Sequence, residues 1–548
     1  MAFLDIRKAF DRVSRPILWH RMFNVGINGR FWRVLRNLYS NFQGLVKIDR
    51  DENTQPFQIG TGVVQGSRLG PTLFNIFFNE LIVEIKRKFR GATFSFGTNL
   101  PVLAYADDLV LLSNDPSEMQ KMLDFCFEFS KINEFEFNAS KCKILHLYKN
   151  TIPALKLGGA VLEVVKNYKY LGVEIGHGLH VGSRPAPFKK YIERISIKAT
   201  SRSFVVHYLG GRGDGLRPQT GLKLYKSLVR PIFDYGSPVL AYTSAQLKKL
   251  EKTQLDVIKR ALGLRQNTKN ETVRILSGIE PLEARFAFLK LKHLYRILQK
   301  PKNSLVRTIF NKISLSGEGR PGFLSECKEL CKTFDIAFEW AAPNNPNMHI
   351  SEFAHSLKSE LYRSAFRRDL ERIRDSNQAK ILASLFPPNT TYYSYMPLDI
   401  MTRILHGKER QVRTAFLQNL CGTSFLANGY RNKCHFCSAK NSTINHYVFE
   451  CQKIVEERSK FFSDITNYIA KINSHLSDLW RKSRTENNRY NICSILFGGN
   501  YALESDNDYI LFRKSHRLQS HTSDRTVLMT ADFLAKLNLK VEETQNEN

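Results

Sequence analysis

The sequence has 548 residues, of which 81 are Lys or Arg and 51 are Asp or Glu, so its formal net charge is +30. Hydrophobic residues make up 43% and aromatic residues 11%, which excludes a largely disordered chain. The sequence contains no apolar run of membrane-spanning length and no signal-peptide pattern, and its nine cysteines do not form a disulfide framework. We therefore expect an intracellular, soluble protein of about three to four domains that binds a polyanion, most commonly nucleic acid.

The first 185 residues alternate apolar strand-like runs with helical periodicity, which is typical of an α+β layer. In chain order, we expect a strand at 1–6, a helix through Val13–Phe23, a hairpin at 44–60, a Gly-rich connection at 62–70, a buried helix from Pro71, a hairpin at 101–112, a helix at 116–136, and strands at 143–148 and 168–175.

The character of the sequence changes after about residue 185. Long amphipathic stretches rich in Lys and Arg follow, and they predict a helical domain with one face toward nucleic acid. An ordinary solvated face is the alternative for each single stretch. Helix-breaking residues at 301–325 indicate a boundary before a third, mostly helical region at 326–548.

Three aspartates stand at the ends of apolar strands. Asp5 ends the first strand, and Asp107 and Asp108 lie in the turn of the 101–112 hairpin. Adjacent carboxylates between apolar arms are costly unless a cation is present, because they repel each other and lose hydration. If the two strands are neighbours, Asp5 and Asp107 can share two Mg²⁺ or Mn²⁺ ions, which would stabilise both oxygens of a phosphoryl displacement. A solvated pair of turn aspartates is the alternative.

Five short segments carry a resemblance to a known family. They are FLDIRKAFD at 3–11, GVVQGSRLGP at 62–71, YADD at 105–108, FNASK at 137–141 and YLG at 170–172. In this order they resemble motifs A to E of the reverse transcriptases of non-LTR (LINE-type) retrotransposons. The resemblance implies a palm at 1–185, with an antiparallel sheet packed on helices, and a helical thumb at 186–300. Residues 195–300 are more weakly similar to the family's thumb.

The resemblance also implies the catalytic groups. Asp5 and Asp107 would bind the two metal ions, and Asp108 would be a secondary ligand or an electrostatic helper. Lys141 matches the motif D lysine, which is a candidate proton donor or charge partner for the departing pyrophosphate. A plain surface lysine is the alternative at that position.

Five further residues would contact the substrate. Phe10 matches a steric gate that selects deoxynucleotides, although an ordinary core phenylalanine is the alternative there. Ile6 and Arg7 would offer backbone N–H groups to the triphosphate. Gln65 and Gly66 match the loop against the template and the incoming base, where glycine allows close backbone approach.

The chain departs from the family pattern in three ways. Val64 stands where the family has proline, and Gly70 where serine is common. The sequence also begins four residues before Asp5, whereas the family's fingers, whose basic side chains clamp the triphosphate, precede motif A. We therefore expect an N-terminally truncated polymerase in which the missing electrostatic clamp severely lowers activity.

A cysteine and histidine cluster follows near the C-terminus. Cys434, Cys437, His446 and Cys451 read C-x2-C-x8-H-x4-C, which gives two short chelating arms of the kind that suit tetrahedral Zn²⁺. We expect a CCHC zinc finger at 434–451 that binds nucleic acid. Reduced structural cysteines are the alternative.

The resemblance implies an RNA-directed DNA polymerase whose partners are an RNA template, a DNA primer or target and dNTPs, with no membrane. A catalytically dead, nucleic-acid-binding remnant of such an element is the alternative. A nuclease that uses the same acids is a third reading. The resemblance further implies a ribonucleoprotein in the nucleus and cytoplasm. The sequence gives no indication of the oligomeric state.

Overall fold

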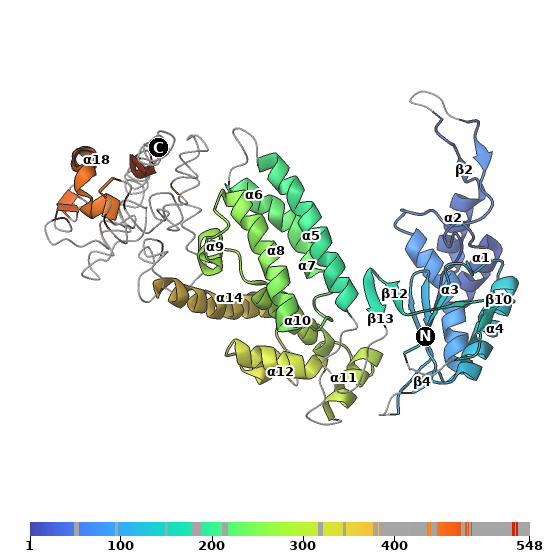
Figure 1. Cartoon of the computed structure of the whole chain (residues 1–548). Helices are drawn as coiled ribbons and strands as arrows, with labels where there is room; N and C mark the ends of the chain where they lie inside the picture. The colour runs from blue at the N-terminus through green and yellow to red at the C-terminus, as the bar shows by residue number, and fades with distance from the viewer. Residues whose placement is uncertain are drawn as a thin grey trace. The chain divides into compact units, whose positions relative to one another are not determined.

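The computed structural model describes a defined part of the chain. This part comprises residues 1–48, 54–93, 97–147, 152–176, 188–210, 218–315, 322–343, 347–375 and 446–472, with isolated positions that include Cys434 and Cys437. Contacts divide the chain into two units (Figure 1). Met1–Tyr191 and Thr308–Gly317 form the first, and Ile192–Arg307 and Glu318–Asn548 the second. The three-part division expected from the sequence stays a prediction.

A five-stranded sheet forms the centre of the first unit. Its strands lie in the order β11 (Glu163–Val165), β8 (Lys143–Leu145), β1 (Ala2–Leu4), β7 (Asp108–Leu111) and β6 (Val102–Tyr105). The three neighbouring pairs from β8 to β6 are antiparallel, and β11 pairs with β8 in parallel. The fully antiparallel sheet expected from the sequence is therefore corrected to a mixed sheet.

Alternation along β1 explains how the sheet is covered on both faces. Ala2 and Leu4 point into the main core, whereas Phe3 points to the opposite face, as the period of two in a strand requires. There the Phe3 ring stacks on Tyr168, with ring centroids 3.9 Å apart. Both faces of this short strand are thus buried, which fixes its register between β7 and β8.

Within the described part of residues 1–176, the helices are α1 (Arg15–Asn24), α2 (Gly29–Ser40), α3 (Gly70–Lys88) and α4 (Pro116–Ile132). Apolar residues at helical spacing on α3, such as Phe74, Phe78 and Leu81, fill the main core. Helix α4 begins where Asp115 caps it and Pro116 takes the first position.

Small two-stranded ladders complete the first unit: β2 (Gln43–Gly44) with β3 (Phe57–Gln58), β4 (Ala92–Thr93) with β5 (Asn99–Leu100), β9 (Lys156–Leu157) with β10 (Ala160–Val161), and β12 (Asn167–Tyr170) with β13 (Val173–Gly176). The strand expected at 168–175 is therefore a hairpin. It turns at Leu171 and Gly172, which both have positive φ.

Phe23 was expected on the apolar face of the first helix. It lies in α1, but its side chain is 59% exposed and does not contribute to the core.

The second unit is helical in the described part of residues 192–375. Its helices are α5 (Lys189–Gly210), α6 (Pro218–Leu224), α7 (Arg230–Asp234), α8 (Ser244–Leu262), α9 (Asn270–Ser277), α10 (Leu282–Leu298), α12 (Phe323–Thr333), α13 (Phe338–Ala341) and α14 (Ile350–Arg374). A π-helical turn, η1 (Tyr225–Val229), joins α6 to α7. Helix α11 (Leu305–Leu315) spans the division between the two units.

Helices α8, α9, α10 and α14 pack together in this unit (Figure 1). Helix α8 has clear boundaries, because Thr243 and Gln246 form a capping box and Gly263, at φ 69°, ends it. Tyr295 on α10 stacks on Phe353 of α14 with ring centroids 3.8 Å apart. These contacts join residues 350–374, assigned from sequence to the third region, to the helices before residue 300.

The described C-terminal segment contains η3 (His446–Glu450), η4 (Gln452–Ile454) and α18 (Val455–Ile472). Most of residues 376–433 and 473–548, and thus much of the region expected to be helical, lies outside the described residues. None of the helices described is both long and apolar enough to cross a membrane.

Candidate active site and metal centre

Two neighbouring strands bring Asp5, Asp107 and Asp108 together. Leu4 pairs with Leu109 across the β1–β7 ladder, so Asp5, which follows Leu4, lies beside Asp108. Asp107 stands in the two-residue turn between β6 and β7, where Ala106 takes a positive φ of 52°. Partial desolvation, followed by the charges of Asp107 and Asp5, raises the pKa of Asp108. The three carboxylates therefore form one electrostatic cluster.

Lys141 lies next to this cluster. Its Nζ is 3.4 Å from Oδ2 of Asp5, and the lysine side chain is 66% exposed. The backbone places it there, because the Asn138 N–H donates to the Asp5 carbonyl at 2.8 Å and the Lys141 N–H donates to the Asn138 carbonyl. An exposed pair of this kind adds little stability. Its position places the ammonium beside the Asp5 carboxylate, at the edge of the acidic cluster.

The residues after Asp5 meet a neighbouring segment. Ile6 is buried and forms an isolated bridge with Phe137. The Arg7 N–H donates to the Glu136 carbonyl at 2.9 Å, so this expected triphosphate donor is already occupied. That part of the expectation is corrected: a contact of Arg7 with phosphate would have to come from its guanidinium, which is 60% exposed and 3.5 Å from Glu136.

Phe10 lies against helix α3 and the Gly-rich loop. Its ring stacks on Phe74 with centroids 5.0 Å apart, and its carbonyl accepts from the Val63 N–H at 2.8 Å. The side chain is partly buried against the main core. This packing fixes the ring, which both a steric gate and a core phenylalanine require, so the two alternatives stay open.

The Gly-rich loop lies close against the segment that follows Asp5. A Cβ on Gly62 would stand 2.7 Å from the Asp11 carbonyl, so only glycine fits there at its φ of 81°. Gln65 and Gly66 are exposed, and a Cβ on Gly66 would meet open space. At Gly70, a Cβ would lie 2.4 Å from the Val64 carbonyl, which leaves no room for the family's serine.

Arg15 is a functional candidate that the sequence reasoning missed. Its buried guanidinium donates to four backbone carbonyls: those of Tyr39 at 2.8 Å, Ile59 at 2.7 Å, Thr61 at 3.1 Å and Gly62 at 3.0 Å. Burial lowers the pKa of Arg15. One side chain thus holds the entry to the Gly-rich loop. Because its partners are backbone atoms distant in sequence, no motif reveals it.

Tyr168 was also missed, and Tyr170, the first residue of the YLG segment, was given no role. They are two residues apart on β12, so both side chains lie on one face of the strand and pack against the cluster that contains Phe3. Burial raises the pKa of both phenols, and the charge of Asp108 raises each further. Their spacing Tyr-x-Tyr, two residues apart on one strand, was the available signal.

The structure brings the four predicted zinc ligands together. The candidate ligand atoms of Cys434, Cys437, His446 and Cys451 all lie within 4.8 Å of one another. Sγ of Cys434 is 3.7 Å from Sγ of Cys451, and two thiolates about 2.3 Å from one tetrahedral Zn²⁺ would be about 3.8 Å apart. The donor set therefore fits zinc.

Contacts around the cluster orient its ligands. Nε2 of His446 is 3.1 Å from Sγ of Cys437, and Nδ1 of the same ring is 3.7 Å from Glu450. In this orientation Nε2 faces the cysteine thiols and Nδ1 faces Glu450. Arg458 donates to the Cys451 carbonyl at 2.8 Å, which anchors the last ligand to α18.

Two strands that bring three acids together define the class of site: a carboxylate centre suited to metal-assisted phosphoryl transfer. Comparison with known proteins supplies the family. Residues 1–175 match the family described as reverse transcriptase (RNA-dependent DNA polymerase). They form a reverse transcriptase domain, and the predicted resemblance to non-LTR retrotransposon enzymes is confirmed.

The relatives are proteins of mobile elements. The chain is 26% identical to "RNA-directed DNA polymerase from mobile element jockey" of Drosophila funebris over 48% of this chain and 28% of the relative. It is 25% identical to "Retrovirus-related Pol polyprotein from type-1 retrotransposable element R2" of Popillia japonica, over 85% of this chain and 60% of the relative. The chain thus spans less than two thirds of the length of these relatives.

Proposed function

We propose that this protein is an RNA-directed DNA polymerase of a non-LTR retrotransposon. The observation that carries the proposal is the convergence of Asp5, Asp107 and Asp108 at the β1–β7 edge of a reverse transcriptase domain. The catalytically dead remnant is not favoured, because all three acids are present and lie together. An RNA template, a DNA primer and dNTPs are the proposed partners. The nuclear and cytoplasmic ribonucleoprotein stays a prediction.

The reaction would follow from the charges at this site. Divalent ions held by Asp5 and Asp107 would supply electrostatic stabilisation to the attacking and leaving oxygens, and Mg²⁺ or Mn²⁺ suits an all-oxygen donor set. Asp108 would add to the negative potential that draws cations in. Lys141 would place a positive charge, or a proton, near the departing pyrophosphate.

Substrate contacts belong to the same proposal. Gln65 and Gly66 would face the template and incoming base, and the open space at Gly66 supports close approach of a nucleotide. Phe10 would lie under the sugar. Ile6 would offer its N–H to the triphosphate, and Arg7 its exposed guanidinium.

Primer extension tests this function. On an RNA template primed with oligo(dT), the full chain should incorporate dNTPs only when Mg²⁺ or Mn²⁺ is present. If Phe10 is the steric gate, Phe10→Ala should lower the preference for dNTPs over rNTPs about tenfold or more. Phe23→Ala, at an exposed ring on α1, is the matched control. No incorporation by the unmodified chain would refute the polymerase, and an unchanged sugar preference would make Phe10 a packing residue.

We further propose that the cysteine and histidine cluster binds one structural Zn²⁺ and helps to hold nucleic acid. Elemental analysis of the purified chain should find one zinc per molecule, and Cys451→Ser should lose it, because three ligands bind far more weakly than four. Cys331→Ala, in α12, should keep the metal. A zinc-free chain whose thermal stability is unaffected by chelators would contradict the proposal.

A further inference from the structure

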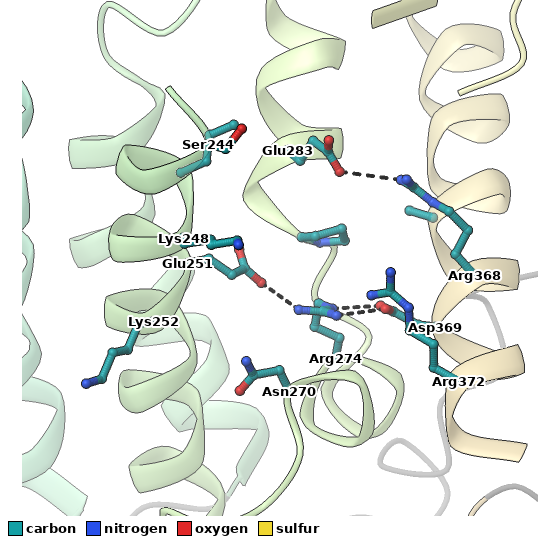
Figure 2. Close-up of a pocket in the computed structure, with 13 residues that line it drawn as sticks. Ser244, Lys248, Glu251, Lys252, Asn270, Arg274, Glu283, Arg368, Asp369 and Arg372 are labelled. Carbon is teal, nitrogen blue, oxygen red and sulfur yellow. Dashed lines mark hydrogen bonds and ion pairs between the residues drawn. The ribbon is translucent and has the colours of Figure 1, made fainter. Parts of the chain in front are cut away.

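A pocket of about 620 Å³ lies in the second unit, between helices that carry no residue of the polymerase site (Figure 2). Residues of α8, α9, α10 and α14 line it. Five lining side chains are cationic and three are carboxylates, so the lining has an excess of positive charge. This volume is within the range of small-ligand sites.

The floor of the pocket is a fixed ion-pair network. Nε and Nη2 of Arg274 each lie 2.7 Å from a carboxylate oxygen of Asp369, and Nη1 is 2.9 Å from Oε1 of Glu251. Glu251 also accepts from the Leu282 N–H at 2.8 Å. These bonds tie α8, α9, α10 and α14 to one another. The pocket is therefore preformed, and Arg274 is largely neutralised within it.

The positive charge that the floor network does not neutralise lies at the rim of the pocket. Lys248 and Lys252 are exposed, lie one turn apart on α8, and have no ion-pair partner within the part of the chain that the structure describes. Across the pocket, Arg368 and Arg372 lie one turn apart on α14. Their carboxylate contacts, at 3.6 Å to Glu283 and 3.5 Å to Glu271, are long and partly exposed to solvent, so they are weak.

We propose that this pocket binds the phosphate groups of a nucleotide. Lysines on one wall and arginines on the other can contact a phosphate from both sides, and an ammonium without a partner loses no existing ion pair when it does so. Leu247, Pro281 and Ala365 offer apolar surface for a sugar or base. Because the site is concave, a nucleotide of a single strand or a free nucleotide fits it better than a duplex backbone.

The test compares two pairs of charge-neutralised lysines in the full chain. Lys248→Gln with Lys252→Gln removes the rim charges, and Lys249→Gln with Lys300→Gln removes two exposed charges outside the pocket. The probes are ATP, measured by calorimetry, and fluorescent oligo(U), measured by anisotropy. The rim pair should weaken binding about tenfold and lower the salt slope for RNA by about two, and the control pair should change each much less.

The two probes distinguish the source of the phosphate. Loss of ATP binding in the rim pair identifies a free nucleotide, and loss confined to oligo(U) identifies a strand. Equal effects of the two pairs on both probes would overturn the proposal, as would no effect of either.

Crosslinking locates the bound RNA on the chain, so it distinguishes binding in the pocket from RNA contacts elsewhere. With oligo(U) that contains 4-thiouridine, a strand-binding pocket should yield crosslinks in peptides that cover 244–252 or 365–372, and the rim pair should lose them. If oligo(U) binding depends on the rim pair but crosslinks map only elsewhere, the strand form of the proposal is wrong. Neither the binding measurements nor the crosslink map requires polymerase activity, so both remain informative if the proposed polymerase function is wrong.

Discussion

Asp107→Asn is expected to lower the rate of primer extension by at least about a thousandfold, because it removes a full negative charge from a proposed ligand of both metal ions. The change is nearly isosteric, and Asp107 lies in a turn at the sheet edge, so the domain should fold as before. Template and primer binding, measured by anisotropy, should change little. That combination separates a catalytic role from loss of structure.

Two comparisons sharpen this result. Asp5→Asn should show a similar loss of rate, since the β1–β7 pairing places it in the same cluster. Asp124→Asn, an equally conservative change on the exposed face of α4, should leave the rate unchanged. A rate for Asp107→Asn within a few-fold of the unmodified chain would remove the physical basis of the polymerase proposal.

Arg15→Met should lower the free energy of unfolding of the first unit by roughly 2–5 kcal/mol. Four carbonyls lose their shared donor, and those of Tyr39 and Gly62 are buried. Each buried carbonyl without a donor costs about 1–3 kcal/mol of folding free energy. Water that enters the space left by the guanidinium can donate to some of these carbonyls and reduce this cost. Urea unfolding followed by circular dichroism measures the change. Arg12→Met, at an exposed arginine nearby, is the control and should cost much less.

A lysine at position 15 distinguishes a role of Arg15 in stability from a role in positioning the Gly-rich loop. Arg15→Lys keeps the charge but cannot donate to four carbonyls at once, so the loop that contains Gln65 should be less well fixed. We expect a higher apparent KM for dNTP with a smaller change in kcat, and partial recovery of KM in Arg15→Gly when guanidinium is added. A variant that is destabilised but kinetically unchanged would limit Arg15 to a structural role.

Local patterns were good predictors of local structure in this chain. The two apolar arms around Tyr105–Asp108 form the expected hairpin, and the helix expected at 116–136 is present as Pro116–Ile132. The acids could be named from sequence because motif order and adjacent carboxylates are themselves sequence features. The hairpin at 167–176 was read as a single strand, because the left-handed residue Leu171 gives no strong turn signal.

Sequence alone determined the class of chemistry, since it depends on the identity and order of a few acids, cysteines and histidines. Only the tertiary structure decided which strands are neighbours, that β11 joins the sheet in parallel, that Arg15 holds the Gly-rich loop, and that Arg274 closes a cationic pocket with Asp369. The reason is physical: turns and helical periodicity arise from neighbouring residues, whereas long-range pairing and buried polar contacts depend on how the whole chain packs.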